Sequence, residues 1–344
     1  MRALVLYGPE DLRCVDVAVP EPGAGEVVVA IEAALTCATD AKTWRRAAHP
    51  SLGPLPARFG HEGAGNIFAV GDGVVGFSVG DPIVMANSAP CGICEWCRRG
   101  RAGLCPDLVY LNGTYAEYVC VPAAIVGANL IVRPWDMPAH LGALTEPVAC
   151  GVRAAERSVA GAGDMVIVLG GGLQGQVVCG EFARRGCEVI LCDPHAERRA
   201  LARAMGASRV EDAPRTQADC TRLRAMTPGG LGAHVTVAAV GDARVWEDAV
   251  RLVRPGGEVN FHGGPAPGDA VHLDATNLHY HEITLQASYH HTPQSVRTAL
   301  ARIVESADSF GRLVGDEITL DGVSDALRAG GVKRIVRPTR TRTS

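Results

Sequence analysis

The stretch M-V-I-V-L-G-G-G-L-Q-G at residues 165–175 decides half of the fold. Its five leading apolar residues predict a strand buried on both faces, which is typical of a parallel sheet covered by helices. Gly170, Gly172 and Gly175 then fit G-x-G-x-x-G, the turn between the first strand and the first helix of a dinucleotide-binding fold. Taken alone the match is weak, because a purely structural glycine turn is the alternative.

The flanking sequence strengthens this interpretation. A helical segment is expected over 176–185, followed by an apolar run at 188–192, a helical pattern at 196–205 and further apolar runs at 235–239 and 259–262. Strands alternating with helices in this way favour a parallel sheet with helices on both faces. We therefore predict a doubly wound α/β domain in this part of the chain.

The sequence also indicates which dinucleotide is bound. The N–H groups of Leu173 and Gln174 are expected to face a pyrophosphate at the positive end of the helix. Asp193 ends the next strand, where a carboxylate binds the ribose hydroxyls and repels a 2′-phosphate, so NAD is favoured over NADP. Arg198 and Arg199 follow closely and would soften that repulsion, unless Arg198 simply covers the adenine face. Because they follow later strands, Val240, Gly241 and His262 are expected near the nicotinamide.

The first ~145 residues have a different sequence pattern. Short β patterns, such as 27–31 and 82–85, are separated by Gly and Pro, which is typical of a small antiparallel β domain. At 344 residues the chain is long enough for about two domains. Mixed strand and helix signals return after about Asp274.

Four cysteines form the run C-x2-C-x2-C-x7-C at Cys91, Cys94, Cys97 and Cys105. Four thiolates fill a tetrahedral zinc shell without water, so this zinc would be structural. The alternative, a pair of disulfides, needs an oxidising compartment. The apolar run near the start, residues 3–7, is too short for a signal-peptide core, and we expect a cytoplasmic protein.

Composition excludes some classes of partner. There are 33 basic and 37 acidic residues, a net charge of −4, which offers no field for nucleic acid. No stretch approaches the ~20 apolar residues of a membrane span. The basic residues near the end are expected to form a solvated or frayed terminus; they are Lys333, Arg334, Arg337, Arg340 and Arg342.

A second metal site is suggested by residues that are far apart in sequence. His61 and Glu62 are adjacent in G-H-E-G-A-G, and Cys37 and Glu146 supply a thiolate and another carboxylate. His61 alone is more simply an ordinary polar residue. Together, one thiolate, one imidazole and one carboxylate make a three-ligand zinc site that leaves a fourth position open.

With these motifs the chain resembles the zinc-dependent medium-chain dehydrogenases, and most closely the sorbitol and threonine dehydrogenase branch. The resemblance covers nearly the whole length. It rests on C-A-T-D at 37–40, G-H-E-x2-G at 60–65, the four cysteines, T-E-P at 145–147, the glycine fingerprint and R-P-G-G at 254–257.

The resemblance implies a fold and a domain plan. A GroES-like antiparallel β catalytic domain would comprise residues 1–147 plus 286–344 and hold both zinc sites. A Rossmann domain with a doubly wound parallel sheet would comprise 148–285 and bind NAD. A homodimer or homotetramer acting on a small-molecule alcohol is implied, with no nucleic acid or membrane partner.

The resemblance also implies roles at the open zinc site. Cys37 and His61 would be ligands, and either Glu62 or Glu146 would be the third direct ligand. Thr39 stands where the family has the hydroxyl that passes the alcohol proton outward. Two residues depart from the pattern: Ala38 replaces the usual glycine, and Lys42 stands where many members carry a relay histidine.

The expected reaction is oxidation of a secondary hydroxyl on a polyol, sugar or cyclitol, because the glutamate at 146 matches polyol dehydrogenases. An L-threonine-like amino alcohol or a simple alcohol is the alternative. The polar stretches at 278–282 and 288–292 would be surface or subunit-edge residues, or else contact the substrate. A zinc-free NADPH reductase and a binding-only protein are less favoured, because neither needs the open site.

Overall fold

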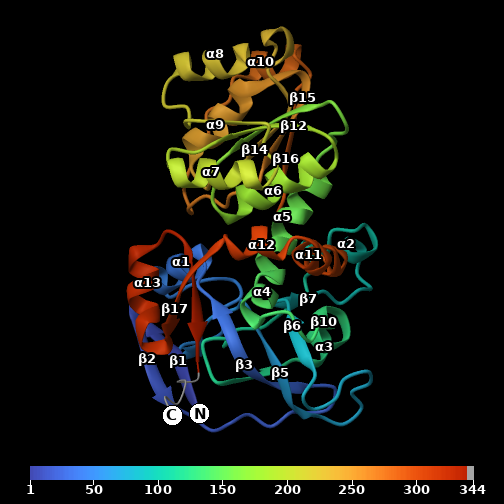
Figure 1. The fold of residues 1–344 in the computed structure, drawn as a ribbon, viewed down its shortest axis with the longest axis vertical. Helices are drawn as coiled ribbons and strands as arrows, with labels where there is room; N and C mark the ends of the chain where they lie inside the picture. The colour runs from blue at the N-terminus through green and yellow to red at the C-terminus, as the bar shows by residue number, and fades with distance from the viewer. Residues whose placement is uncertain (339–344) are drawn as a thin grey trace. The chain divides into compact units, whose positions relative to one another are not determined.

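The computed structural model describes residues 1–338 and divides the chain into two compact units (Figure 1). The first unit contains Met1–Pro147 and the segment from Thr292 onward, and the second contains Val148–His291. The chain passes from the first unit to the second within helix α5 (Thr145–Arg157). Arg340 and Arg342 lie outside the described residues.

The second unit is built on one parallel sheet. Its strands are β11 (Met165–Leu169), β12 (Glu188–Cys192), β13 (Arg209–Glu211), β14 (Ala233–Ala238), β15 (Val253–Phe261) and β16 (Thr284–Ala287). They lie in the order β13-β12-β11-β14-β15-β16, and every pairing is parallel. Numbered within the unit, this order is 3-2-1-4-5-6, that of a doubly wound dinucleotide-binding fold. The predicted fold class is confirmed here.

Helices cover both faces of this sheet, as Figure 1 shows. They are α5, α6 (Leu173–Arg184), α7 (Ala196–Ala204), α8 (Gln217–Ala225), α9 (Ala243–Leu252) and α10 (Ala275–Tyr280), with a 3-10 turn at Pro228–Gly230. Side chains of β11 alternate between the faces. Ile167 packs with buried residues of α8 and α9, whereas Val166 and Val168 pack with residues of α5, α6 and α7. A strand buried on both faces must be apolar throughout, which explains its sequence.

Two boundaries differ from the sequence-based expectation. Helix α6 begins at Leu173 rather than at residue 176, because Gly172 is its extended N-cap residue. The segment 254–257 lies inside β15, where the pairing with β14 shifts register. A bulge absorbs the turn-prone Pro-Gly-Gly sequence there without ending the strand.

The first unit contains three sheets. Their strands are β1 (Arg2–Gly8), β2 (Asp11–Asp16), β3 (Val27–Leu35), β4 (Ala57–Arg58), β5 (Gly63–Val70), β6 (Pro82–Met85), β7 (Ser88–Ala89), β8 (Val109–Tyr110), β9 (Tyr118–Val121), β10 (Leu130–Val132), β17 (Val314–Thr319) and β18 (Lys333–Arg337). The largest sheet runs β10-β6-β5-β3-β18-β17, with β9 also paired to β3. All pairings in the unit are antiparallel except β17 with β18.

Helices and a shared apolar core close the first unit. The helices are α1 (Ala38–Arg46), α2 (Glu95–Arg98), α3 (Ala123–Asn129), α4 (Ala139–Ala143), α11 (Pro293–Glu305), α12 (Ala307–Gly311) and α13 (Val323–Ala329), with 3-10 turns at Ala102–Leu104 and Leu320–Gly322. The core contains Trp44, Phe59 and Tyr115 together with residues of β3, β5 and β18. The last part of the chain therefore completes a sheet that the first part began, and Figure 1 shows α13 beside α1.

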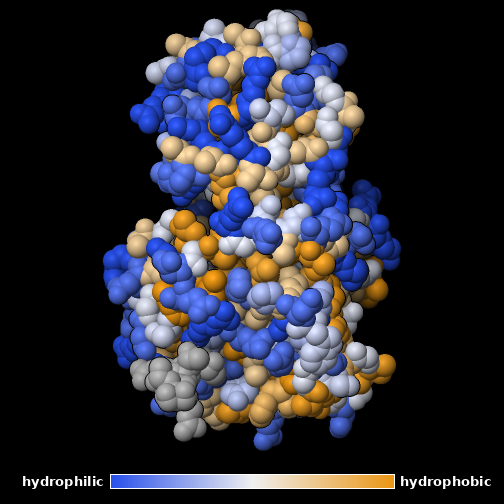
Figure 2. Space-filling view, in the orientation of Figure 1, coloured by the Kyte–Doolittle hydropathy of each residue, from blue (hydrophilic) through white to orange (hydrophobic). Residues whose placement is uncertain are grey.

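The visible surface intermingles hydrophilic and hydrophobic residues (Figure 2). Among residues 1–338, no helix combines the length and apolar character that a membrane crossing requires.

Candidate metal and cofactor sites

Cys37, His61 and Glu62 meet in the first unit. Cys37 is the N-cap residue of α1, where its sulfur accepts a hydrogen bond from the backbone N–H of Thr39. His61 and Glu62 immediately precede β5, which pairs with β3 and so brings them beside the end of that strand. One ligand atom from each of the three residues lies within 4.8 Å of the others. Sulfur, imidazole nitrogen and carboxylate oxygen form a donor set that suits zinc.

The imidazole of His61 is oriented by Asp40. Its Nδ1 lies 2.8 Å from Oδ1 of Asp40, and both side chains are buried. An ionised carboxylate accepts a hydrogen bond, so Nδ1 carries the proton and Nε2 is left for a metal. Burial by itself would lower the pKa of His61, but the Asp40 carboxylate outweighs it and raises that pKa well above the usual value.

Lys333 neutralises Glu62, a partnership the sequence did not reveal. The Lys333 ammonium donates hydrogen bonds to both carboxylate oxygens of Glu62, at 2.6 and 2.5 Å, and to the carbonyl of Thr36 at 3.0 Å. Its side chain is only 11% exposed, and Glu62 is fully buried. Burial opposes the charge on Lys333, but Cys37 and Glu62 more than compensate and raise its pKa.

The expectation of a solvated basic terminus is therefore wrong for Lys333. Residues 333–337 form β18, which pairs with both β17 and β3, and this places Lys333 against Glu62. Arg334 and Arg337 do reach carboxylates on exposed side chains, Asp316 and Glu317. The adjacent β-branched residues Ile335 and Val336 in K-R-I-V-R were a weak strand signal.

Glu146 holds a different position from Glu62. It is buried in the first turn of α5 and contributes to the raised pKa of Lys333, which places it in the same electrostatic environment. The group of Cys37, His61 and Glu62 whose ligand atoms all lie within 4.8 Å does not include it.

A cavity of about 240 Å³ opens beside Cys37 and Lys333. Lys42 and Arg45, from the exposed side of α1, line it along with the Gly330–Gly331 turn. Thr39 is half-buried, two residues from Cys37. The positive charges of Lys42 and Arg45 favour anionic groups there, whereas that of Lys333 is already paired with Glu62.

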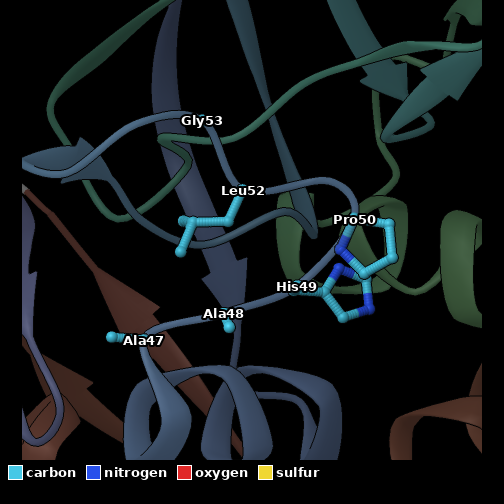
Figure 3. Close-up of a pocket in the computed structure, with 6 residues that line it drawn as sticks. All are labelled: Ala47, Ala48, His49, Pro50, Leu52 and Gly53. Atoms are coloured by element: carbon cyan, nitrogen blue, oxygen red, sulfur yellow. The ribbon is translucent and has the colours of Figure 1, made fainter.

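A second, shallower pocket follows α1 (Figure 3). Its six lining residues are Ala47, Ala48, His49, Pro50, Leu52 and Gly53, and its volume is about 470 Å³. His49 is its one titratable side chain. Burial lowers the pKa of His49, and the positive charge of His61 lowers it further. The negative charge of Asp40 raises that pKa, but by less. This pocket therefore lies within electrostatic reach of the His61 site.

The four cysteines of the lobe converge as the spacing predicts. One sulfur from each of Cys91, Cys94, Cys97 and Cys105 lies within 4.8 Å of the others, and all four are free thiols. The Cys94–Cys97 and Cys91–Cys97 sulfur separations are 3.4 and 4.0 Å. A tetrahedron with Zn–S bonds of ~2.3 Å has edges of ~3.8 Å, so the lobe fits zinc, and disulfide-length contacts of ~2.05 Å do not occur there.

The lobe also lowers the cost of ionising one thiol. Backbone N–H groups of Ile93 and Cys94 lower the pKa of Cys91 to about 7. Desolvation and the neighbouring thiols raise the pKa of Cys97 to about 12, so the lobe favours one thiolate first. A divalent cation would remove the remaining repulsion between thiolates.

In the second unit, the glycine turn has the close contacts that its sequence requires. Gly170 has φ +105°, and a Cβ there would lie 2.4 Å from Cγ2 of Val240. A Cβ on Gly175 would lie 1.8 Å from the carbonyl oxygen of Gly170. The helix therefore packs directly on the strand end, with Leu173 and Gln174 in its first turn.

Asp193 lies beside this turn at the end of β12. Its Oδ2 accepts the Gly171 N–H at 2.7 Å, and its Oδ1 accepts the His195 N–H at 2.8 Å. Burial opposes ionisation, but these backbone donors lower the pKa of Asp193 overall. A guanidinium nitrogen of Arg198 is 3.7 Å from Oδ2, whereas Arg199 pairs with Asp212 at 2.5 Å.

His262 follows β15 and links two parts of the second unit. Its Nε2 lies 2.9 Å from Oε1 of Gln174, and its Nδ1 lies 3.0 Å from Oγ of Ser288. Burial lowers the pKa of His262 to about 4, so the ring is neutral at physiological pH. Val240 follows β14 and is 40% exposed beside Gly170.

Sequence reasoning missed Asp40, Tyr115 and Lys333. Asp40 was quoted only as the last letter of C-A-T-D, and its position in the first helical turn after Cys37 was the available signal. Tyr115 had no signal of its own. For Lys333 the strand signal was the β-branched pair Ile335 and Val336, which was not weighed.

Comparison with known proteins agrees with this geometry. Residues 23–129 match the family described as alcohol dehydrogenase GroES-like domain, and residues 175–305 match zinc-binding dehydrogenase. The fold, the cysteine lobe and the Cys37–His61–Glu62 cluster thus define a zinc-binding dehydrogenase. The chain belongs to the zinc-dependent alcohol dehydrogenase family of medium-chain dehydrogenases.

Individual relatives differ in substrate and coenzyme. The chain is 34% identical over 286 residues to L-threonine 3-dehydrogenase of Pyrococcus furiosus, covering 79% of this chain and 76% of that one. It is 30% identical to erythritol/L-threitol dehydrogenase of Mycolicibacterium smegmatis, covering 76% of each. A zinc-binding dehydrogenase of Sinorhizobium meliloti with NADP bound is structurally similar, with TM-score 0.89, 28% identity and coverage of 98% and 99%.

Proposed function

We propose that this oxidoreductase oxidises a secondary hydroxyl of a polyol, sugar or cyclitol to a ketone and passes the hydride to NAD. The observation that carries the proposal is the convergence of Cys37, His61 and Glu62, with Asp40 and Lys333 supplying the charges that hold them. An L-threonine-like amino alcohol is the second candidate, supported by the relatives that act on L-threonine.

The residues present suit a zinc ion at this site and another in the cysteine lobe, two per chain. Bound zinc would supply Lewis-acid polarisation of the substrate oxygen, and the nicotinamide would accept the hydride. Cys37 and His61 are proposed as direct ligands. The third direct ligand is proposed to be Glu62, whose ligand atom lies within 4.8 Å of those of Cys37 and His61, or Glu146 if Lys333 keeps both oxygens of Glu62.

The remaining residues would position the reactants and move the proton. Thr39 is a half-buried residue at the start of α1, and its hydroxyl would take the alcohol proton towards solvent. Lys42 lines the adjacent cavity and would hold an oxygen of the coenzyme or substrate. Asp193 would accept the ribose hydroxyls, and Val240 and His262 would border the nicotinamide.

The deciding experiment is a substrate panel with metal analysis. Polyols, cyclitols, L-threonine and simple alcohols would each be tested with NAD and with NADP, following reduced-coenzyme absorbance. We expect the largest kcat/KM for a polyol or cyclitol with NAD, and two zincs per chain. A clear preference for L-threonine would select the second candidate, and no turnover with any alcohol would refute both.

Coenzyme choice has its own test in Asp193→Asn. The substitution keeps the shape but removes the negative charge that opposes a 2′-phosphate. We expect the ratio of kcat/KM for NAD over NADP to fall by about tenfold. Glu188→Gln, which removes an exposed carboxylate at the other end of β12, is the matched control. An unchanged ratio would remove Asp193 from the proposal.

A further inference from the structure

Tyr115 is a buried phenol that no catalytic step described above uses. It lies between β8 and β9, is 0% exposed, and its ring centroid is 6.0 Å from that of Phe59. Its backbone N–H donates to the Phe59 carbonyl at 3.1 Å. Gly60 packs face-on against the ring, since a Cβ there would lie 2.6 Å from Cγ of Tyr115. The ring therefore fixes the segment that leads directly into His61.

The hydroxyl of Tyr115 reaches Asp40. It lies 2.5 Å from Oδ2 of Asp40 and 3.0 Å from the carbonyl oxygen of Leu35. A phenol has one proton to donate, and an ionised carboxylate makes the shorter and stronger bond. Oδ1 of the same carboxylate receives the Nδ1–H of His61 at 2.8 Å. The two oxygens of Asp40 are thus held by donors from two different segments of the chain.

We infer that Tyr115 is a positioning residue for the metal site: its hydroxyl locks the Asp40 carboxylate in the orientation that presents Nε2 of His61 to a divalent cation. The inference rests on the metal site put forward under Proposed function. Without the hydroxyl, the carboxylate can rotate about its last bond and the imidazole loses its fixed orientation. The packing role belongs to the ring alone, so a phenylalanine would preserve it.

The test is Tyr115→Phe in the full-length, zinc-loaded protein, with metal binding as the first readout. Zinc would be titrated away with a chelator, and cobalt would be substituted to report ligand geometry by its visible absorption. We expect zinc at the Cys37–His61 site to bind about five- to tenfold more weakly. That is less than the 10–100-fold loss typical when the direct partner of a ligating histidine is removed. The cobalt spectrum of that site should shift.

The four-cysteine lobe is a control within the same molecule, because a general loss of stability would loosen both metals. Tyr118→Phe is the matched variant. Tyr118 lies three residues after Tyr115, and its ring centroid is 4.7 Å from that of Phe68. Zinc affinity should be unchanged at the lobe in Tyr115→Phe and at both sites in Tyr118→Phe. An unaltered affinity and spectrum in Tyr115→Phe, or equal weakening of both metals, would overturn the inference.

A double-mutant cycle tests whether Tyr115 acts through Asp40. Asp40→Asn should cost more than Tyr115→Phe, and the double variant should cost little more than Asp40→Asn alone, since the two act in series. Additive losses would overturn the inference. A wild-type chain that binds zinc only in the cysteine lobe would refute the metal site itself, and this inference with it. Normal loading of both sites with an unchanged Tyr115→Phe would refute the inference alone.

Discussion

The four-cysteine lobe and the Cys37–His61–Glu62 cluster are both built around thiols, but they are assembled differently. The lobe takes four identical ligands from fifteen consecutive residues, and its local charges are met by backbone N–H groups of the same loop. The cluster takes three kinds of ligand from two segments, Cys37 and the adjacent pair His61 and Glu62, with charged partners at Asp40 and Lys333. A closed site can be locally complete, whereas an open site needs distant residues to stabilise its charges.

The largest effect should come from Cys37→Ser, which removes a proposed ligand of the open site only. We expect kcat/KM to fall by about 10³-fold or more, equivalent to ~4 kcal/mol, because the Lewis acid is lost or displaced. Metal analysis should show one zinc fewer, with the lobe still loaded. Cys14→Ser, a thiol of β2 outside both sites, is the control. Activity that survives Cys37→Ser would favour a zinc-free mechanism.

Cys94→Ser makes the reciprocal change in the lobe. A closed site contributes folding energy, so we expect the free energy of unfolding to fall by about 3 kcal/mol with loss of one zinc. Denaturant unfolding and metal content would measure this. The kcat/KM of the folded fraction should fall far less than in Cys37→Ser. If kcat/KM in Cys94→Ser fell as far as in Cys37→Ser, the two sites would not act separately, and the contrast between a structural and an open site would be wrong.

Lys333→Met tests the long-range charge partner. Glu62 would become an uncompensated buried carboxylate, free to turn towards the metal and occupy its open position. We expect kcat/KM to fall about 10–100-fold, or ~1.4–2.7 kcal/mol, while zinc is retained. Fluorescence or circular dichroism would verify folding.

Two controls sharpen that experiment. Arg334→Met removes the adjacent cation of β18, whose partner Asp316 is exposed, and should change activity little. Lys333→Met combined with Glu62→Gln removes both buried charges and should restore any lost stability. Persistent instability in the double variant would show that Lys333 acts through packing.

The smallest effect concerns pH. In the metal-free chain the raised pKa of His61 means that its extra proton is held at neutral pH and must leave before Nε2 can bind a metal. Zinc affinity at this site should therefore fall about tenfold for each pH unit below that pKa. Chelator competition across a pH series would measure it.

Asp40→Asn removes the carboxylate that favours the protonated ring, so the fall in affinity should begin at a lower pH. The lobe has no such carboxylate–imidazole pair, and its pH profile should be the same in this variant. An Asp40→Asn profile that coincides with the wild type would show that Asp40 does not control the protonation of His61.

The contrast between the two sites also explains which features could be predicted from the sequence alone. The bounds of β11 and β12 and the convergence of the four cysteines were predictable, because each depends on neighbouring residues. The bond from Lys333 to Glu62 was not, since it joins residues 271 positions apart and no local pattern specifies its partner. The hydrogen bonds of Asp40 required knowing how α1 packs beside residues 59–61. The proton-transfer role of Thr39 stays a prediction.

The late position of β18 has a consequence for synthesis on the ribosome. Glu62 is buried against an ammonium group that is made 271 residues later. At about 5–20 residues per second, translation takes roughly 15–50 s to cover that distance. For most of that interval the cysteine lobe has all its ligands. The nascent first unit, by contrast, holds an acidic group without its counter-charge and a large sheet without β17 and β18. The lobe can therefore acquire its metal while the chain is still growing, and the open site matures only after β18 has been made.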